Sequence, residues 1–222
     1  MAVGDMFVAM VDILEFGAVE VERYAEVLTQ TAQAVARADR DAAIAALHPI
    51  AGEIWMGRLT TANRSGSNAV RAARRVGNET LRAQVFVRDR FRCTCCGGRA
   101  IPRSILVAIH DLFPDQVSYD VHYTRGKMHP VFWALAPEAD HVLAHSRGGA
   151  NELNNLTTLH AACNTRKSDT LIADMPLLDT RLRSDDWDGL TSLYPALISA
   201  GAGEMRPTYH RTWSRRYAAL MP

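Results

Sequence analysis

The hydrophobic positions of residues 5–38 repeat every seven residues. Phe7, Leu14, Val21, Leu28 and Val35 stand in this register. A seven-residue repeat is typical of an amphipathic helix, because such residues return to the same helix face. A second helical pattern covers about residues 41–60, and Pro49 should break or kink it. We expect the two helices to pack as a hairpin.

The N-terminal segment, residues 1–62, is therefore expected to form a helical region, for which two roles are open. The helices could pack onto the rest of the same chain as an intramolecular cap. Apolar residues outside the repeat, namely Ile13, Val19 and Val27, could instead contact a second copy of the chain. A homodimer through the N-terminal helices is thus one prediction, and a cap is the other.

Residues 63–175 differ in character. The polar segment 63–68 (NRSGSN) indicates a boundary, and a basic helix is expected over about 69–90. The stretch 97–137 is predicted to be an apolar insertion with a short helix at 102–112. The remainder predicts a ββα unit with these parts: strand 139–142, loop 146–149, strand 156–159 and helix 161–170.

The C-terminal extension, residues 176–222, is expected to contain one or two helices around 186–200 and a tail rich in aromatic and basic residues. The tail residues are Tyr209, His210, Arg211, Trp213, Arg215, Arg216 and Tyr217. Such a pattern could stack on nucleobases and follow phosphates. It could equally pack back onto the core as an amphipathic helix.

Composition narrows the class of protein. The 222 residues are 48% hydrophobic, which is ordinary for a globular chain. No apolar run reaches the roughly 18 residues of a membrane span, and acidic residues interrupt the N-terminus, so a cytoplasmic protein without a membrane partner is expected. Three of the four cysteines fall within residues 93–96, and in a reducing compartment this clustering favours metal binding over disulfides.

The net charge of +1 conceals an uneven distribution. Residues 1–60 hold nine acids and four arginines, a net charge of −5, whereas residues 64–103 hold ten arginines and two acids, a net charge of +8. The planar guanidinium group binds phosphate well, so the basic block favours a polyanionic partner. Arginine enrichment from a GC-rich genome is the competing explanation.

Two pairs of soft ligands, each separated by two residues, predict a structural zinc site. The ligands are Cys93, Cys96, His160 and Cys163. Four nitrogen and sulfur ligands in two pairs are the composition of a closed zinc site, which would join residues 97–137 to the ββα unit. Gly97 gives the backbone freedom for a tight turn after the first pair. Cys95 could replace Cys96, although the C-x-x-C register favours Cys96.

Harder ligands and an imidazole stand beside these pairs. Asp140 and Asn164 offer oxygen atoms that suit Mg²⁺ or Mn²⁺, and such a cation would neutralise charge on a phosphate under attack. His141, neutral near pH 7, could accept a proton from the attacking water. Asn155 is better placed to brace the loop or orient the His141 ring than to bind metal. Lys167 follows Asn164 by one helical turn and could contact phosphate.

Residues 92–169 resemble the HNH endonuclease family. The matching segments are FRCTCCG (91–97), ADHVLAHSRGG (139–149) and NELNNLTTLHAACNTRKSD (151–169). The resemblance implies a ββα-metal (His-Me finger) fold stapled by zinc, with His141 as general base. Asp140 and Asn164 would hold the catalytic metal, and Asn155 would be the central asparagine of an H-N-N form of the motif. His160 stands where a cysteine is more usual.

The sequence thus predicts an α+β protein with a zinc-stapled nuclease core and a helical N-terminal region. The predicted function is metal-dependent DNA cleavage, in restriction or phage defence or in phage or mobile-element DNA processing. Its DNA contacts are expected at Arg71, Arg74, Arg75, Arg147 and Lys167. The alternatives are a non-catalytic zinc-stapled DNA-binding protein and a nuclease that acts on RNA or single strands.

Overall fold

A computed structural model describes residues 10–11, 16–57, 78–143, 148–167, 177–183 and 185–221. The strands are β1 (Met10–Val11), β2 (Ile54–Trp55), β3 (Pro137–His141) and β4 (Leu156–His160). The helices are α1 (Ala18–Ala36), α2 (Arg40–Leu47), α3 (Glu79–Arg88), α4 (Arg103–Leu112), α5 (Val131–Ala134), α6 (Ala161–Lys167), α7 (Tyr194–Leu197), α8 (Gly203–Met205) and α9 (Pro207–Ala218). Three short helical turns are η2 (Leu153–Asn155), η4 (Thr180–Leu182) and the π-helical η5 (Ile198–Ala202).

Helices α1 and α2 pack against each other as the predicted hairpin, and the repeat positions Val21 and Leu28 are buried. Helix α1 begins at Ala18, so the prediction of a helix over residues 5–38 is wrong at residues 10–11 and 16–17, the described positions that precede it. Residues 10–11 pair in parallel with 54–55 instead, and Gly17 is extended (φ −64°, ψ 165°). The repeat positions Phe7 and Leu14 lie outside the described residues.

The second helix is also shorter than the predicted range of about 41–60. Helix α2 ends at Leu47, just before Pro49, and residues 54–55 form β2 rather than more helix. Gly52 has a positive φ of 71° between them, which glycine adopts without steric cost. The predicted break at Pro49 is therefore confirmed, and the predicted helix beyond it is wrong.

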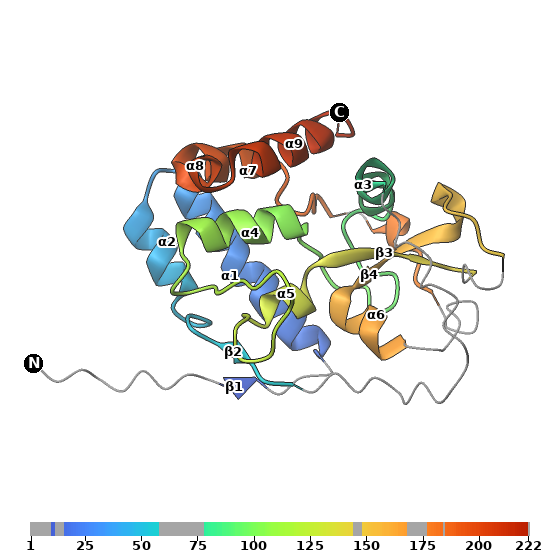
Figure 1. Cartoon of the computed structure of the whole chain (residues 1–222), viewed down its shortest axis with the longest axis horizontal. Coiled ribbons are helices and arrows are strands. Elements are labelled where there is room, and N and C mark those ends of the chain that lie inside the picture. Colours follow the sequence, from blue (N-terminus) through green and yellow to red (C-terminus); the bar gives the residue numbers. More distant parts are fainter. Residues whose placement is uncertain are drawn as a thin grey trace, which may run out of the picture.

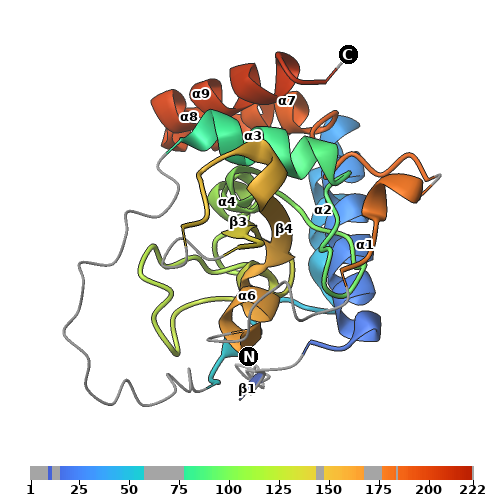
Figure 2. The ribbon, with the colours of Figure 1, turned by 90° about the vertical axis from the view of Figure 1, so that its right-hand side faces the viewer.

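The predicted ββα unit is present. Strand β3 pairs antiparallel with β4, with Asp140 opposite Thr157 and His141 opposite Leu156, and α6 follows β4 directly. Helix α3 contacts both strands from one side and α6 contacts both from the other, as Figures 1 and 2 show. The small sheet is thereby held between two helices, which fixes the positions of the residues at the end of β3.

The core is built around α4, whose sequence RSILVAIHDL is apolar on most sides. The helix agrees with the short helix predicted at 102–112, and its residues Ile105, Leu106 and Ile109 are fully buried. They belong to one hydrophobic cluster that also includes Leu28 from the N-terminal region and Tyr194 from the C-terminal extension. Burial of each large side chain of this kind stabilises the fold by roughly 2 kcal/mol.

The C-terminal helices pack back onto the core, one of the two arrangements open for the tail. Figures 1 and 2 show α7 to α9 along the side of α4 away from α6. His210 and Tyr217 are buried. The Tyr194 hydroxyl lies 2.7 Å from His210 Nδ1, and His210 Nε2 lies 2.9 Å from Asp111 Oδ2. The predicted helix around 186–200 begins only at Tyr194.

Candidate active site and metal centre

The four predicted zinc ligands converge on one point. The ligand atoms of Cys93, Cys96, His160 and Cys163 all lie within 4.8 Å of one another. Cys96 Sγ is 3.5 Å from His160 Nδ1. When ligand atoms lie about 2.0–2.3 Å from a tetrahedral zinc ion, they lie roughly 3.3–3.8 Å from one another. The cluster could therefore hold a zinc ion.

A tight turn brings the first pair of ligands to the cluster. Gly97 has a positive φ of 75°, and its amide donates to the Cys93 carbonyl at 2.7 Å. The Cys93 amide donates in turn to the Gly98 carbonyl at 3.0 Å. The turn presents Cys93 and Cys96 to the junction of β4 and α6, where His160 and Cys163 stand three residues apart.

Groups around the cluster orient its ligands. His160 Nε2 lies 3.0 Å from the Arg99 carbonyl oxygen, so Nε2–H donates there and Nδ1 keeps its lone pair for a metal. The His160 amide donates to Cys93 Sγ at 3.4 Å, and Arg166 donates to Cys163 Sγ at 3.4 Å. Such donors stabilise thiolates, the form in which cysteine binds zinc.

The pKa values within the cluster diverge. Burial is the main reason that the pKa of Cys93 lies well above its ordinary value. Hydrogen bonds from Cys163 and Cys93 hold the pKa of Cys96 far below that of an ordinary thiol. Burial alone would lower the pKa of His160, but hydrogen bonds with Cys163 and Cys96 outweigh it and raise this pKa to about 9. Zinc binding would therefore displace protons from the cluster.

Cys95 is outside the group of four clustered ligands. It is half-buried and packs against Cys93, Leu159 and Cys163. A hydrogen bond from Cys93 lowers its pKa to about 7. Of the two cysteines between which the sequence left a choice, Cys96 is the one whose sulfur reaches the cluster.

The predicted catalytic residues lie on the ββα unit. Asp140 and His141 are the last two residues of β3, and both are half-buried. Asn164 lies on α6, and its Nδ2 donates to Glu138 Oε2 on β3 at 2.8 Å. Side chains alternate along a strand, so Asp140 is on the same face of β3 as Glu138. The helix thus brings the Asn164 amide to the strand face that carries Asp140.

Asn155 braces the loop between β3 and β4, as predicted. Its Oδ1 accepts from the Leu143 amide at 2.9 Å, and its Nδ2 donates to the carbonyls of Leu143 and Ala150 at 3.1 and 2.9 Å. Both ends of the amide are engaged. A Cβ added at Gly149 would lie 1.8 Å from the Leu143 carbonyl oxygen, so glycine is required beside this brace.

The His141 ring has a partner that the sequence did not identify. Its Nε2 is 2.7 Å from Asn151 Oδ1. An amide oxygen only accepts hydrogen bonds, so Nε2 carries the proton and Nδ1 is the basic nitrogen. Asn151 therefore makes a side-chain contact that orients the ring, whereas Asn155 is bonded to the backbone of Leu143 and Ala150.

Glu138 and Asn151 are the two residues of this site that pattern reasoning missed. Glu138 stands two positions before Asp140, and alternation would have put both on one face, but the strand was expected to begin only at residue 139. Asn151 had no such signal. Its contact with His141 depends on the path of the loop, which residue spacing does not specify.

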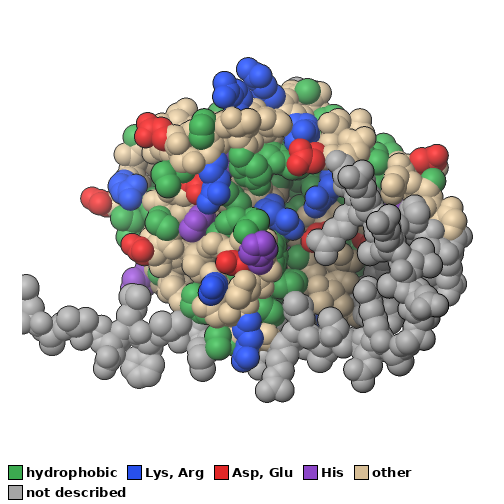
Figure 3. All heavy atoms as spheres, in the orientation of Figure 1, with side chains coloured by type: hydrophobic (Ala, Val, Ile, Leu, Met, Phe, Trp, Pro, Cys, Tyr) green, Lys and Arg blue, Asp and Glu red, His purple; other side chains and the backbone are tan. Residues whose placement is uncertain are grey.

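Many described arginines of the basic block are paired within the chain. The ion pairs are Arg88–Asp89 (2.7 Å), Arg92–Asp185 (2.5 Å), Arg99–Glu22 (2.6 Å) and Arg103–Glu138 (3.3 Å). Their charge is therefore not simply available to a polyanion. On the face in Figure 3, basic side chains are scattered among acidic and hydrophobic ones. Of the predicted DNA contacts, Arg71, Arg74, Arg75, Arg147 and the Lys167 side chain lie outside the described residues.

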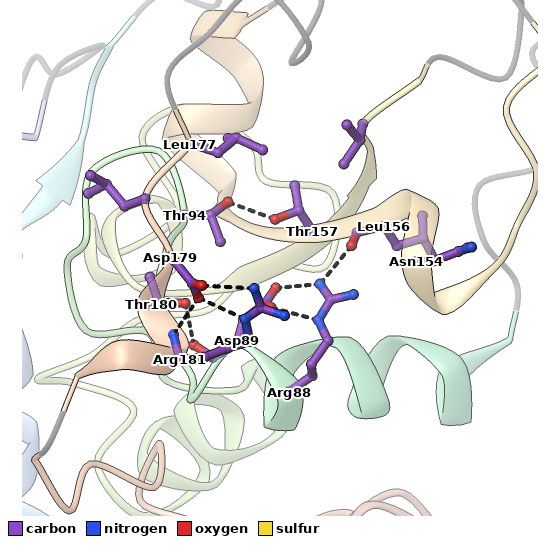
Figure 4. Close-up of a pocket in the computed structure, with 12 residues that line it drawn as sticks. Arg88, Asp89, Thr94, Asn154, Leu156, Thr157, Leu177, Asp179, Thr180 and Arg181 are labelled. Carbon is purple, nitrogen blue, oxygen red and sulfur yellow. Dashed lines mark hydrogen bonds and ion pairs between the residues drawn. The ribbon is translucent and has the colours of Figure 1, made fainter.

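A pocket of about 280 Å³ borders the start of β4. Figure 4 shows the Thr94 and Thr157 hydroxyl groups, 2.7 Å apart, along one part of its lining. Arg88 is also part of the lining, and it donates to the Leu156 carbonyl oxygen at 2.7 Å and pairs with Asp89. The other lining arginine, residue 181, pairs with Asp179. The charges of the pocket thus cancel in pairs, and its lining indicates no particular ligand.

The segment that contains the ββα unit also matches a known protein family. The family model for HNH endonucleases matches residues 131–170, which run from α5 through the ββα unit. No curated protein and no solved structure matches the chain. Residues 131–170 are thus similar to HNH endonucleases, and they lie within a mixed helix-and-sheet fold. In the described part of the chain, no helix has the length and apolar character to cross a membrane.

Proposed function

We propose that this chain is a metal-dependent endonuclease that hydrolyses phosphodiester bonds in DNA. The observation that carries the proposal is the coincidence of the HNH match with the strand and helix that bear Asp140, His141 and Asn164. The neighbouring cluster of three cysteines and one histidine supports the zinc-stapled form of the domain.

Asp140 and Asn164 would hold the catalytic cation. Both present oxygen atoms, the ligands that Mg²⁺ and Mn²⁺ prefer. Because Asn164 Nδ2 is bonded to Glu138, the atom of its amide that remains for a cation is the oxygen. When bound, the cation would stabilise the negative charge that develops on the phosphate and on the leaving 3′-oxygen.

His141 serves as the general base. Its Nε2–H is donated to Asn151, so Nδ1 takes the proton from the attacking water. Attack on phosphorus with departure of the 3′-oxygen leaves 5′-phosphate and 3′-hydroxyl ends, as the family resemblance implies. Asn155 keeps this geometry by tying the start of the loop, at Leu143, to its later part at Ala150.

The cysteine and histidine cluster would hold zinc in a structural role. Four protein ligands close the coordination of the ion and leave no position for substrate. The first pair lies in the turn after α3, and the second pair lies on β4 and α6. Zinc would therefore tie this turn to the ββα unit and stabilise the strand and helix that carry the proposed catalytic residues.

A panel of substrates tests the proposal. Wild-type protein and the Asp140→Ala variant are incubated with duplex DNA, single-stranded DNA and RNA, with and without Mg²⁺ or Mn²⁺. We expect cation-dependent cleavage of duplex DNA that the variant has lost. Binding of DNA without cleavage would favour the non-catalytic DNA-binding protein, and preferential cleavage of RNA or single strands would favour a nuclease of a different substrate class.

We further propose restriction or phage defence, or phage or mobile-element DNA processing, as the setting. A homodimer would let an enzyme with one active site per chain cut both strands. Helix α1 buries most of its apolar side chains in its own chain, and Val19, 78% exposed, remains at the surface. If supercoiled plasmid is used as the duplex substrate, linear product without a nicked intermediate would support the dimer.

A further inference from the structure

Glu138 lies between Asn164 and an arginine of the core helix α4. Its Oε2 accepts from Asn164 Nδ2 at 2.8 Å, and its Oε1 accepts from Arg103 at 3.3 Å. Arg103 is itself held over the Tyr123 ring, with 5.0 Å between its Cζ and the ring centroid. The carboxylate is half-buried. One acidic side chain thus links the catalytic helix to the core of the protein.

The Asn164 amide has two chemically different ends, and only one of them can bind a cation. The oxygen is a metal ligand, whereas the NH₂ group is a donor and repels a cation. Nothing in the covalent structure of an asparagine decides which end faces its neighbour. A carboxylate oxygen beside Nδ2 does decide it, because that oxygen accepts from NH₂ and repels the amide oxygen.

We propose that Glu138 is a positioning residue that turns the Asn164 oxygen toward Asp140 and the catalytic cation. The inference rests on the proposed function and adds a residue to it. Arg103 neutralises Glu138 and fixes the carboxylate against α4. Both carboxylate oxygens accept hydrogen bonds, one from Arg103 and one from Asn164, so the carboxylate is held in place between the two side chains.

A double-mutant cycle on Mn²⁺ affinity tests this role. Binding of Mn²⁺ to zinc-loaded protein is measured by electron paramagnetic resonance for the wild type, Glu138→Ala, Asn164→Asp and the double variant. We expect Glu138→Ala to weaken Mn²⁺ binding roughly 10-fold, the scale for losing a group that orients a metal ligand. In the Asn164→Asp background the same change should cause no loss, because a carboxylate has two equivalent oxygens and needs no orientation.

Two results would overturn the positioning role. An equal loss of affinity in both backgrounds would make Glu138 a direct ligand, and an unchanged affinity in the wild-type background would leave it without a role. Glu152→Ala, which removes an exposed carboxylate of the same domain, is the control for nonspecific charge. Zinc content and thermal stability are compared to show that each variant folds.

The same experiment separates this inference from the proposed function. Asp140→Ala should abolish the Mn²⁺ binding that Glu138→Ala only weakens. If Asp140→Ala leaves Mn²⁺ affinity unchanged, the catalytic cation site itself is wrong, and the role of Glu138 falls with it. If only the Glu138 cycle fails, the nuclease proposal stands.

Discussion

At the scale of single residues, a hydrogen bond to the His141 ring bears on the basicity of the site. The 2.7 Å hydrogen bond between His141 Nε2 and Asn151 Oδ1 selects the tautomer in which Nδ1 is unprotonated. Asn151 is exposed, so its replacement should change the chemistry and leave the core intact. The role of the residue is therefore separable from folding.

Replacing Asn151 should alter the rate and its pH dependence. For Asn151→Ala we expect a fall in cleavage rate of roughly 10-fold, a fraction of the roughly 10²–10⁴-fold that a general base contributes. For Asn151→Asp the acid limb of the pH–rate profile should move to higher pH, because a carboxylate stabilises the imidazolium. Asn154→Ala, at an exposed position three residues away, should change neither. A pH–rate profile that Asn151→Asp leaves unmoved would contradict the assignment.

Residue types and spacing were enough to predict the four clustered ligands and the two strands and helix that carry the proposed catalytic residues. They were not enough for Glu138 or Asn151. The first acts through a hydrogen bond between strand and helix, and the second through a loop. Both contacts depend on three-dimensional approach rather than on a repeated interval in the chain.

At the scale of elements, the turn after α3 and the junction of β4 with α6 are brought together by the cysteine and histidine cluster and by the hydrogen bond from the Thr94 amide to the Thr158 carbonyl. Cys93 and Cys163 are buried, whereas Cys95 is half-buried beside them. Because structural zinc contributes directly to the stability of a small fold, removal of one ligand should affect the elements on both sides. The adjacent residues Cys95 and Cys96 allow a matched comparison, because only Cys96 is among the four clustered ligands.

We predict that Cys96→Ser loses zinc and lowers the thermal midpoint, whereas Cys95→Ser retains about one zinc ion per chain, the stoichiometry of a single closed site. Zinc content measured by mass spectrometry of the metal, together with thermal unfolding, checks this. Full zinc occupancy in Cys96→Ser and loss in Cys95→Ser would show that the other cysteine is the ligand.

The prediction of elements succeeded where the seven-residue apolar pattern belonged to a single helix. It failed where the same pattern also covered a short strand. Val21 and Leu28 follow the seven-residue repeat and are buried in α1. Met10 and Val11 fit the same apolar pattern but lie in a strand. A two-residue strand is too short to show alternation, so its existence rests on its partner, residues 54–55, which lies more than forty positions away.

At the scale of the whole molecule, a buried histidine joins segments distant in sequence. His129 Nε2 donates to the Ile50 carbonyl at 2.8 Å, and its Nδ1 accepts from the Val131 amide at 3.2 Å. The ring is completely buried. Burial lowers the pKa of His129 to about 4, whereas the unfolded chain has a value of about 6.5. The folded protein therefore requires the neutral ring.

This difference predicts a loss of stability in acid. Between pH of about 6.5 and about 4 the unfolded chain binds the proton more readily, so the free energy of unfolding falls with falling pH by up to about 3 kcal/mol. The contribution is fully present above pH of about 6.5. In His129→Gln, which keeps a donor and an acceptor, this part of the pH dependence should vanish.

Denaturant unfolding of both proteins at pH 7.5 and pH 5 measures the effect. The zinc ligands titrate in both proteins, so the difference between wild type and His129→Gln isolates the histidine. An identical loss of stability in the two proteins on acidification would contradict the role of His129.

The three regions expected from composition contribute to a common core. Residues from the N-terminal region, the predicted insertion and the C-terminal extension share one hydrophobic cluster. The charge profile likewise suggested a phosphate-binding block, but arginines such as Arg92 and Arg99 neutralise acids elsewhere in the chain. Net charge along a sequence does not reveal which charges will find each other after folding.

The most direct test of the proposed function is cleavage of plasmid DNA in Mg²⁺ or Mn²⁺ by wild-type protein beside His141→Ala, with zinc content shown to be equal. We expect the wild type to cleave and the variant to be slower by about 100-fold or more, the least that a general base contributes. Equal cleavage by both proteins would contradict the assignment of His141. If zinc-loaded wild type binds DNA but does not cleave it, the proposal that the protein is a nuclease would be contradicted.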